Sequence, residues 1–229
     1  MSTPTDRTPA APAAPAAPAR RGRQAEAARN DAAILEAART VFLRDPAAPM
    51  SAVAHEAGVG VGGLYRRYAG KDELLQTLCG DGLRRFVALA EETVARLDDG
   101  GDAWAAFEGF VRGVVESDVH ALTVRLAGTF RSTPELRALA VRSGPLVAGL
   151  VARAREAGVL RPDVTDADLP MVFEQLTAVR VEDVERTAQL RRRYLALHLD
   201  ALRARHGSAT LPGGPPTASE LRERWDRSH

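Results

Sequence analysis

The sequence of 229 residues contains a single cysteine, Cys79, and a single lysine, Lys71. One cysteine excludes an intrachain disulfide and any metal site built from several cysteines, and we expect its thiol to be buried as a small apolar group. No uncharged apolar run approaches the roughly 18 residues that a membrane span requires, and the N-terminus lacks the apolar core of a signal peptide. We therefore expect a folded cytoplasmic protein with no membrane partner.

Positive charge is concentrated near the N-terminus. Residues 20–71 hold nine basic and five acidic side chains, a net charge of +4, whereas residues 72–229 carry a net charge of −3. A basic small domain on an acidic larger one suits a polyanionic partner for the first part only. Arg20, Arg21 and Arg23 form a basic arm. Such an arm can enter the minor groove of DNA or serve solubility alone, and the sequence leaves both open.

Composition divides the chain into four regions. Residues 1–24 comprise an Ala/Pro-rich tail, which we expect to be disordered, and the basic arm. Residues 25–71 contain short helical patterns, and residues 72–206 contain longer ones. Residues 207–229 are rich in Gly and Pro and are typical of a second tail. No alternating strand pattern is long enough to predict a strand, so the expected fold is all-α.

Helical periodicity and helix-breaking residues define the expected elements. Asn30 is the expected N-cap of the first helix, Asp45-Pro46 its end, and Gly144-Pro145 a break between two later helices. Gly58 follows a short helix, where a left-handed backbone favours glycine. The predicted helices are at about 30–44, 50–57, 60–68, 72–97, 102–116, 119–130, 134–142, 145–156, 166–182 and 183–205.

The segment GVGVGGLYRRYAGKDELL, residues 58–75, raises two alternatives. Gly58, Gly60 and Gly63 spell the G-x-G-x-x-G pattern of dinucleotide-binding loops, but that pattern must follow a strand within a βαβ unit. Here the alanine-rich segment 51–57 precedes the glycines and favours a helix. The alternative is a helix-turn-helix, in which the second helix enters the major groove of DNA. We prefer this alternative.

In a helix-turn-helix, the residues around the second helix have distinct tasks. Tyr65 can donate its hydroxyl to a phosphate, and Lys71 lies beside the N-terminus of the next helix, where it can hold another phosphate. Arg66 and Arg67 can contact guanine or the DNA backbone, and their positions alone do not decide which. Tyr68 is expected to pack in the interior instead.

These residues carry a resemblance to a known family. Residues 30–75 are similar to the N-terminal domain of the TetR family of transcriptional regulators, through Val53-Ala-His-Glu-Ala-Gly-Val59, Leu64-Tyr65-Arg-Arg-Tyr68 and Lys71-Asp-Glu-Leu-Leu75. The resemblance implies a homodimeric repressor that binds a palindromic double-stranded DNA operator, responds to a small-molecule effector and needs no cofactor. It assigns phosphate contacts to Tyr65 and Lys71. The base-facing positions it implies are Val61, Gly62, Gly63 and Arg66.

Glycines depart from the family pattern at three positions. Gly60 replaces the serine that usually caps the recognition helix, Gly63 replaces a Thr or Ser, and Gly70 replaces the serine before the lysine. Losing a cap hydroxyl to glycine costs only a few tenths of a kcal/mol. Arg67 stands where the family usually has His, and it can supply a compensating phosphate contact.

The larger domain is expected to bind the effector and form the dimer. We expect an apolar or aromatic effector, although ordinary core is the favoured interpretation for each aromatic candidate taken alone. The candidate pocket residues are Trp104, Phe107, Phe110, His120, Arg125, Phe130, Met171 and Phe173. From the resemblance, the last two helices would pair with their two-fold mates, and the same residues could instead form intrachain core. The candidate interface residues are Val172, Leu176, Val179, Leu190, Tyr194, Leu197 and Ala201.

Two competing functions remain open. An enzyme would place catalysis on His120, Asp118 or Glu116, but no metal-ligand or catalytic spacing supports it, so we expect a protein that is not an enzyme. An architectural or dimerising protein with a degenerate recognition helix is the stronger alternative, because glycines replace hydroxyl residues in that helix.

Overall fold

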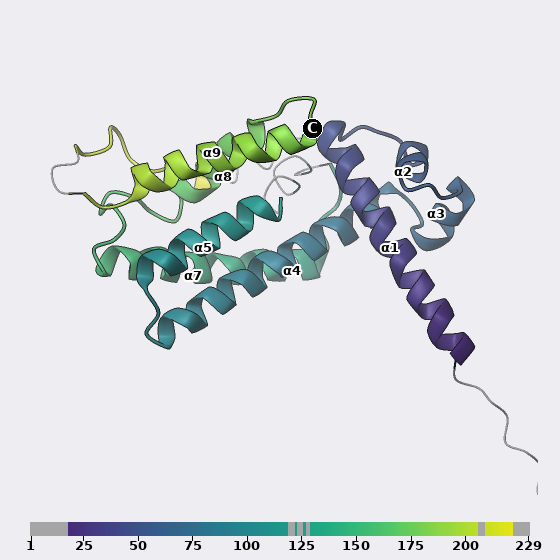
Figure 1. Cartoon of the computed structure of the whole chain (residues 1–229), viewed down its shortest axis with the longest axis horizontal. Coiled ribbons are helices and arrows are strands. Elements are labelled where there is room, and N and C mark those ends of the chain that lie inside the picture. The colour runs from purple at the N-terminus through teal and green to yellow at the C-terminus, as the bar shows by residue number, and fades with distance from the viewer. Residues whose placement is uncertain (1–17, 119–121, 123–125, 127–128, 206–208, 222–229) are drawn as a thin grey trace, which may run out of the picture.

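A computed structural model of the chain describes residues 18–118, 122, 126, 129–205 and 209–221, with the side chains of residues 18–28 left out. Within these residues the fold is all-α (Figure 1), as the sequence predicts. The helix labels follow Figure 1. The helices are α1 (Pro18–Arg44), α2 (Met50–Glu56), α3 (Val61–Arg67), α4 (Lys71–Asp98), α5 (Ala103–Glu116), α7 (Pro134–Glu156), α8 (Asp168–Ala178) and α9 (Val184–Leu202).

Helices α1 to α3 form one end of the molecule, and α4 runs from them into a helical body (Figure 1). In the body, α4, α5 and α7 lie in one layer, and the α8–α9 hairpin covers them. None of the helices within the described residues is long and apolar enough to cross a membrane.

Helix α1 begins well before the predicted start. It starts at Pro18, so Asn30 is an interior residue and the prediction of an N-cap there is wrong. Residues 19–29 are mostly Ala, Arg, Gln and Glu, which favour a helix, and proline is tolerated in the first turn. The predicted tail at residues 1–17 lies outside the described residues.

The turn between α2 and α3 follows the sequence prediction. Gly58 has a φ of +66°, a left-handed conformation that an L side chain would strain. Gly60 occupies the N-cap of α3, and no side chain accepts a hydrogen bond there. The two helices therefore form the helix-turn-helix, and the absence of a capping hydroxyl on α3 is confirmed.

Two hydrophobic clusters form the core, and α4 contributes to both. The first joins α1, α2 and α3 to the beginning of α4, with Cys79 buried inside it as expected. It also includes Leu122, Leu126 and Leu136 from the larger region. The second cluster fills the body between α5, α7, α8 and α9. The N-terminal core therefore extends beyond residue 71, where the sequence places the domain boundary.

Helices α7, α8 and α9 differ from the prediction. One continuous helix contains Pro145, so the predicted break at Gly144-Pro145 is wrong. Pro145 lacks the N–H that would bond to the carbonyl of Val141, and Val141 is 76 % exposed, so water can replace that bond. Helix α8 ends at Ala178 rather than near residue 182, and Asp183 caps α9 by accepting a hydrogen bond from the Arg186 N–H.

The described part of the C-terminal segment is held against the α7–α8 connection. The side chain of Arg161 bonds both carboxylate oxygens of Asp163 and donates to the carbonyl of Ala209. The Leu211 N–H donates to Asp163 at 2.8 Å. Chiefly because of the Arg161 bonds, the pKa of Asp163 lies well below its ordinary value. A short helical segment begins at residue 218 in this region, which the sequence predicts to be a tail.

Candidate nucleic-acid interface

Helix α3 buries one side and exposes the other. Leu64 is fully buried and anchors the helix in the first core. On the opposite side, Val61 is 43 % and Tyr65 is 50 % exposed, and Gly62 and Arg66 are exposed as well. Positions four apart share one face of a helix, so Val61 and Tyr65 lie together, as do Gly62 and Arg66. We call these four residues the outer face of α3.

Arg67 turns back toward α1. Its Nε atom lies 2.5 Å from an Asp31 carboxylate oxygen, an ion pair that ties the end of α3 to the first helix. Tyr68 is buried in the first core, as expected. Burial, followed by the charge of Asp31, raises the pKa of the Tyr68 phenol. The sequence allows Arg67 a contact with guanine or with the DNA backbone, and the structure gives it a partner within the domain.

Lys71 also bonds within the domain. Its ammonium donates to the carbonyl oxygens of Pro46 at 2.7 Å and Ala48 at 2.9 Å, and it lies 5.1 Å from the centre of the Phe42 ring. These contacts join the start of α4 to the α1–α2 connection. Sequence reasoning missed this role, because nothing in the sequence brings residue 71 to residues 46–48. Its phosphate contact stays a prediction.

The structure brings together only part of the predicted interface. Val61, Gly62, Tyr65 and Arg66 share the outer face, and Gly63 is half-buried beside them. The side chains of Arg20, Arg21 and Arg23 lie outside the described residues, so the basic arm stays a prediction. Asp31 is a positioning residue that the sequence did not reveal, since its partner is 36 positions along the chain.

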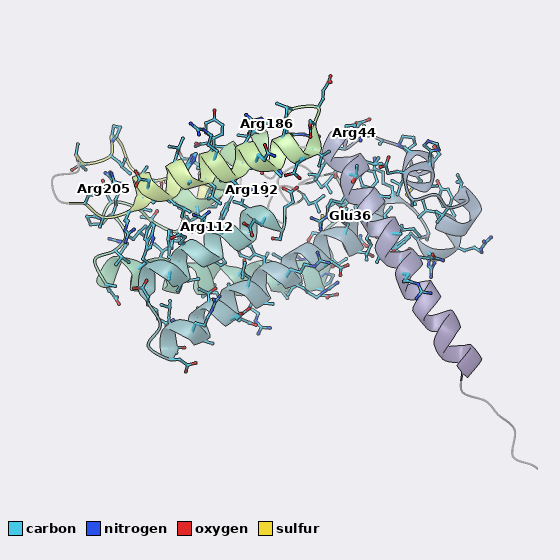
Figure 2. All side chains as sticks on the ribbon, in the orientation of Figure 1. Glu36, Arg44, Arg112, Arg186, Arg192 and Arg205 are labelled. Atoms are coloured by element: carbon cyan, nitrogen blue, oxygen red, sulfur yellow. The ribbon has the colours of Figure 1, made fainter. Side chains whose placement is uncertain are left out.

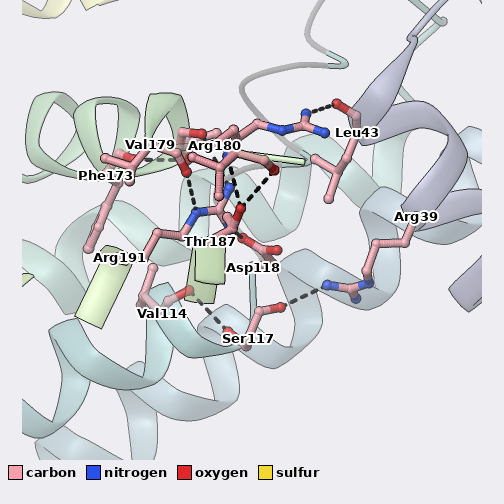
Figure 3. A network of polar contacts seen from close by, with 12 residues as sticks. Arg39, Leu43, Val114, Ser117, Asp118, Phe173, Val179, Arg180, Thr187 and Arg191 are labelled. Carbon is pink, nitrogen blue, oxygen red and sulfur yellow. Dashed lines mark hydrogen bonds and ion pairs between the residues drawn. The ribbon is translucent and has the colours of Figure 1, made fainter. Parts of the chain in front are cut away.

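A polar network connects α1 to the helical body (Figure 3). Arg39 donates to the carbonyl of Ser117 at 2.8 Å, and Arg180 donates to the carbonyl of Leu43. Arg191 donates to Asp118 at 2.6 Å and to the carbonyls of Val179 and Thr177. Helix α1 is thus hydrogen-bonded both to the end of α5 and to the α8–α9 connection.

Asp118 holds an unusual backbone conformation in this network. Its φ of 53° is left-handed, a region that Asp adopts more readily than most residues. A cleft of about 250 Å³ adjoins it, between α1 and the α8–α9 hairpin. Glu36 and Arg44, labelled in Figure 2, line the cleft from α1. The cleft lining mixes acidic and basic side chains, most of which already bond one another or a carbonyl.

The predicted pocket residues mostly belong to the core. Trp104, Phe107, Phe110 and Phe173 are all buried in the second cluster. Phe173 lines a cavity of about 10 Å³, enough for roughly one water molecule. Met171 is half-buried, and Phe130 packs on the first cluster. His120 and Arg125 lie outside the described residues.

The predicted dimer residues fall into two groups. Val172 and Leu176 are buried in the second cluster, so they form intrachain core within this chain. Val179 and Leu190 are half-buried. On α9, Tyr194 is 42 % and Leu197 is 56 % exposed, and Ala201 is exposed as well. The exposed apolar residues of α9 are therefore the ones that can contact a second copy.

The described residues offer no obvious metal chemistry. Across that part of the chain, no three His, Cys, Asp or Glu side chains gather where they could hold a metal ion. Of the residues considered for catalysis, Asp118 is paired with Arg191, and His120 lies outside the described residues.

The geometry defines a helix-turn-helix protein with an exposed recognition helix and a larger helical domain behind it. Residues 34–78 match the sequence profile of the bacterial regulatory proteins of the tetR family. A search of curated proteins gives no match. The chain therefore carries the N-terminal domain of the TetR family, and its fold is that of the family's transcriptional regulators.

Solved structures share the fold over most of the chain. A TetR transcription regulatory protein from Mycobacterium vanbaalenii is 26 % identical, with a TM-score of 0.51, and the match covers 79 % of this chain and 99 % of that one. The ketosteroid regulator KstR2 of Mycobacterium tuberculosis is 21 % identical, with a TM-score of 0.54 over 76 % and 95 % of the chains. LfrR from Mycobacterium smegmatis, solved with proflavine, is 22 % identical, with a TM-score of 0.55 over 80 % and 99 %.

Proposed function

We propose that this chain is a homodimeric repressor that binds a palindromic DNA operator through the outer face of α3. One observation carries the proposal: a TetR-family helix-turn-helix presents Tyr65 and Arg66 on an exposed surface while Leu64 anchors the same helix in the core. A duplex can reach this face without unfolding the domain. The glycine at position 62 leaves little bulk between the backbone and the DNA.

The exposed apolar side chains of α9 support dimerisation. Tyr194 and Leu197 leave large apolar surface in contact with water in a single chain. A two-fold pairing of α9 would bury both, and it would present two recognition helices to the two halves of a palindrome. Replacing Leu197 with Glu should therefore yield a monomer in sedimentation experiments and weaken operator binding.

An effector site among the predicted aromatic pocket residues would require a rearrangement of the second core. Drug-sized ligands occupy cavities of roughly 300 to 1,000 Å³, whereas the cavity beside Phe173 measures about 10 Å³. We therefore propose that a small apolar or aromatic effector binds a conformer in which this core has opened and the recognition helices are misplaced. The effector need only favour that conformer by a few kcal/mol to release the DNA.

Selection from a random duplex library tests DNA binding directly. Full-length protein should enrich a palindromic sequence, and its affinity for that duplex should fall steeply with salt as counterions are released. Tyr65→Phe should weaken binding to specific and random duplexes by similar factors, because a phosphate contact carries no sequence information. Equal affinity for every sequence would favour the architectural alternative, which the uncapped, glycine-rich start of α3 makes worth testing.

A thermal-shift screen of apolar and aromatic compounds tests the effector proposal. A true effector should raise the melting temperature and weaken operator binding, and the operator should weaken effector binding by the same factor. A compound that stabilises the protein without changing its operator affinity is no effector. If every stabilising compound behaves in this way, release by an effector is wrong.

A further inference from the structure

Arg66 differs from the other basic residues around α3. Arg67 is paired with Asp31, and Lys71 is bonded to two carbonyl oxygens. Arg66 is exposed, and within the described residues its guanidinium has no hydrogen bond and no ion pair. Its N–H donors are therefore available to a partner outside the chain.

The Arg66 guanidinium lies beside the glycines of α3. A Cβ atom added at Gly62 would stand 3.8 Å from Nη1 of Arg66, and one added at Gly63 would stand 3.7 Å from Nη2. The side chain therefore runs back along the helix, as helical side chains do, and its guanidinium lies against the first turn. Larger side chains at positions 62 and 63 would compete for this space.

This placement favours a base over a phosphate. In helix-turn-helix proteins, the first turn of the recognition helix faces the base edges, and flanking groups hold the backbone. The guanidinium of Arg66 lies at that turn, although the Cα atom of Arg66 is near the end of α3. In the major groove, guanine offers the adjacent O6 and N7 acceptors that match two parallel N–H donors.

We propose that Arg66 reads a guanine in each half of the operator. This inference rests on the proposed DNA-binding function and adds to it the base that the outer face of α3 recognises. Tyr65, on the same face, then contacts the backbone, while Arg67 and Lys71 hold the helix in place.

The test uses the duplex selected by the wild-type chain and a panel in which each base pair is replaced in turn. Arg66→Ala should bind the selected duplex roughly ten- to a hundredfold more weakly and should lose its preference at one guanine per half-site, as expected for a bidentate contact. Arg66→Gln should shift the preference at that position toward adenine. Arg85→Ala, which removes an exposed positive charge from α4, is the matched control and should keep the wild-type preferences.

The outcomes separate the inference from the proposed function. If wild-type protein selects a palindrome and Arg66→Ala keeps every base preference while binding all duplexes more weakly, Arg66 contacts phosphate and the inference is wrong. If wild-type protein selects no sequence, the proposed function fails and the inference fails with it. Circular dichroism of each variant should match the wild-type spectrum, because Arg66 is exposed; loss of helix in Arg66→Ala would make it a structural residue and also overturn the inference.

Discussion

The candidate residues on the outer face of α3 are exposed, whereas those in the interior of the helical body are buried. On α3, Tyr65 and Arg66 are exposed on a short helix that its neighbours hold in position. In the body, Phe107, Phe110 and Phe173 fill the core. The proposed DNA-binding surface is thus already formed in this conformation, whereas an effector site among these aromatic side chains would have to be created by moving them. The following predictions test this contrast, and the largest effect comes first.

Cys79 reports whether the first core is closed. Burial raises the pKa of its thiol to about 12 from an ordinary value of 9.0. At about pH 8 the thiolate fraction, and with it the rate of maleimide labelling, should be on the order of a thousandfold lower in the folded protein than in urea. Equal rates in both conditions would show that this core opens readily.

The same shift has a consequence for stability. Ionisation of the thiol favours the unfolded chain, because the folded state has the higher pKa. The contribution of the neutral thiol is therefore complete below about pH 9 and is progressively lost as the pH rises from 9.0 toward 12. Cys79→Ala should remove this part of the pH dependence.

Phe107→Ala tests the second core. Phe107 is fully buried, so the variant should lower the free energy of unfolding by about 3–5 kcal/mol in urea titrations. Val61→Ala on the outer face of α3 is the control and should change stability by no more than about 0.5 kcal/mol. A small loss for Phe107→Ala would mean that the core already holds adaptable space for an effector.

Lys71→Met tests the internal role of the lysine. The variant keeps the length of the side chain but leaves the carbonyls of Pro46 and Ala48 without their charged donor. We expect a loss of about 1–3 kcal/mol in the free energy of unfolding. Unchanged stability together with a large loss of DNA affinity would instead assign Lys71 to phosphate binding alone.

Asp31→Asn separates two roles of Arg67. Part of the pair is exposed, so stability should fall by no more than about 1 kcal/mol. If Arg67 positions α3, affinity for the selected duplex should fall a few-fold. Glu36→Gln, which removes one negative charge from the same helix, is the control. If Asp31→Asn raises the DNA affinity more than Glu36→Gln does, Arg67 contributes more by binding a phosphate than by positioning α3.

Gly62→Ala should have the smallest effect. A Cβ there meets only ordinary contact with Arg66, so the variant should fold and gain about 0.5–1 kcal/mol of stability in the same titrations. A loss of stability would contradict the open packing of this face.

Local patterns explain most of what the sequence predicts correctly. The short helices around Gly58, the long α4 and the burial of Leu64 and Tyr68 follow from periodicity and from the conformational freedom of glycine. Errors arose where local rules compete with the surroundings. Pro145 sits inside α7 because the exposed turn before it can be hydrated, and α1 extends to Pro18 through residues that favour a helix.

The candidate site was predictable only in part, because a sequence shows which residues are available but not which are already occupied. The outer face of α3 follows from helical spacing. The partners of Arg67 and Lys71 do not follow from helical spacing. Asp31 and the carbonyls of residues 46 and 48 come close to these side chains only in the folded chain. Similarly, Arg39, Arg180 and Arg191 donate mainly to backbone carbonyls. Every residue has a carbonyl, so the sequence cannot show which one an arginine will bond.

Hydrogen–deuterium exchange with and without the selected duplex tests the DNA-binding surface most directly. Peptides that cover residues 58–70 should gain the strongest protection on binding, while α9, which we propose pairs with a second copy in both states, should change little. Protection centred on the helical body, with exchange at residues 58–70 unaltered, would contradict DNA binding through the outer face of α3.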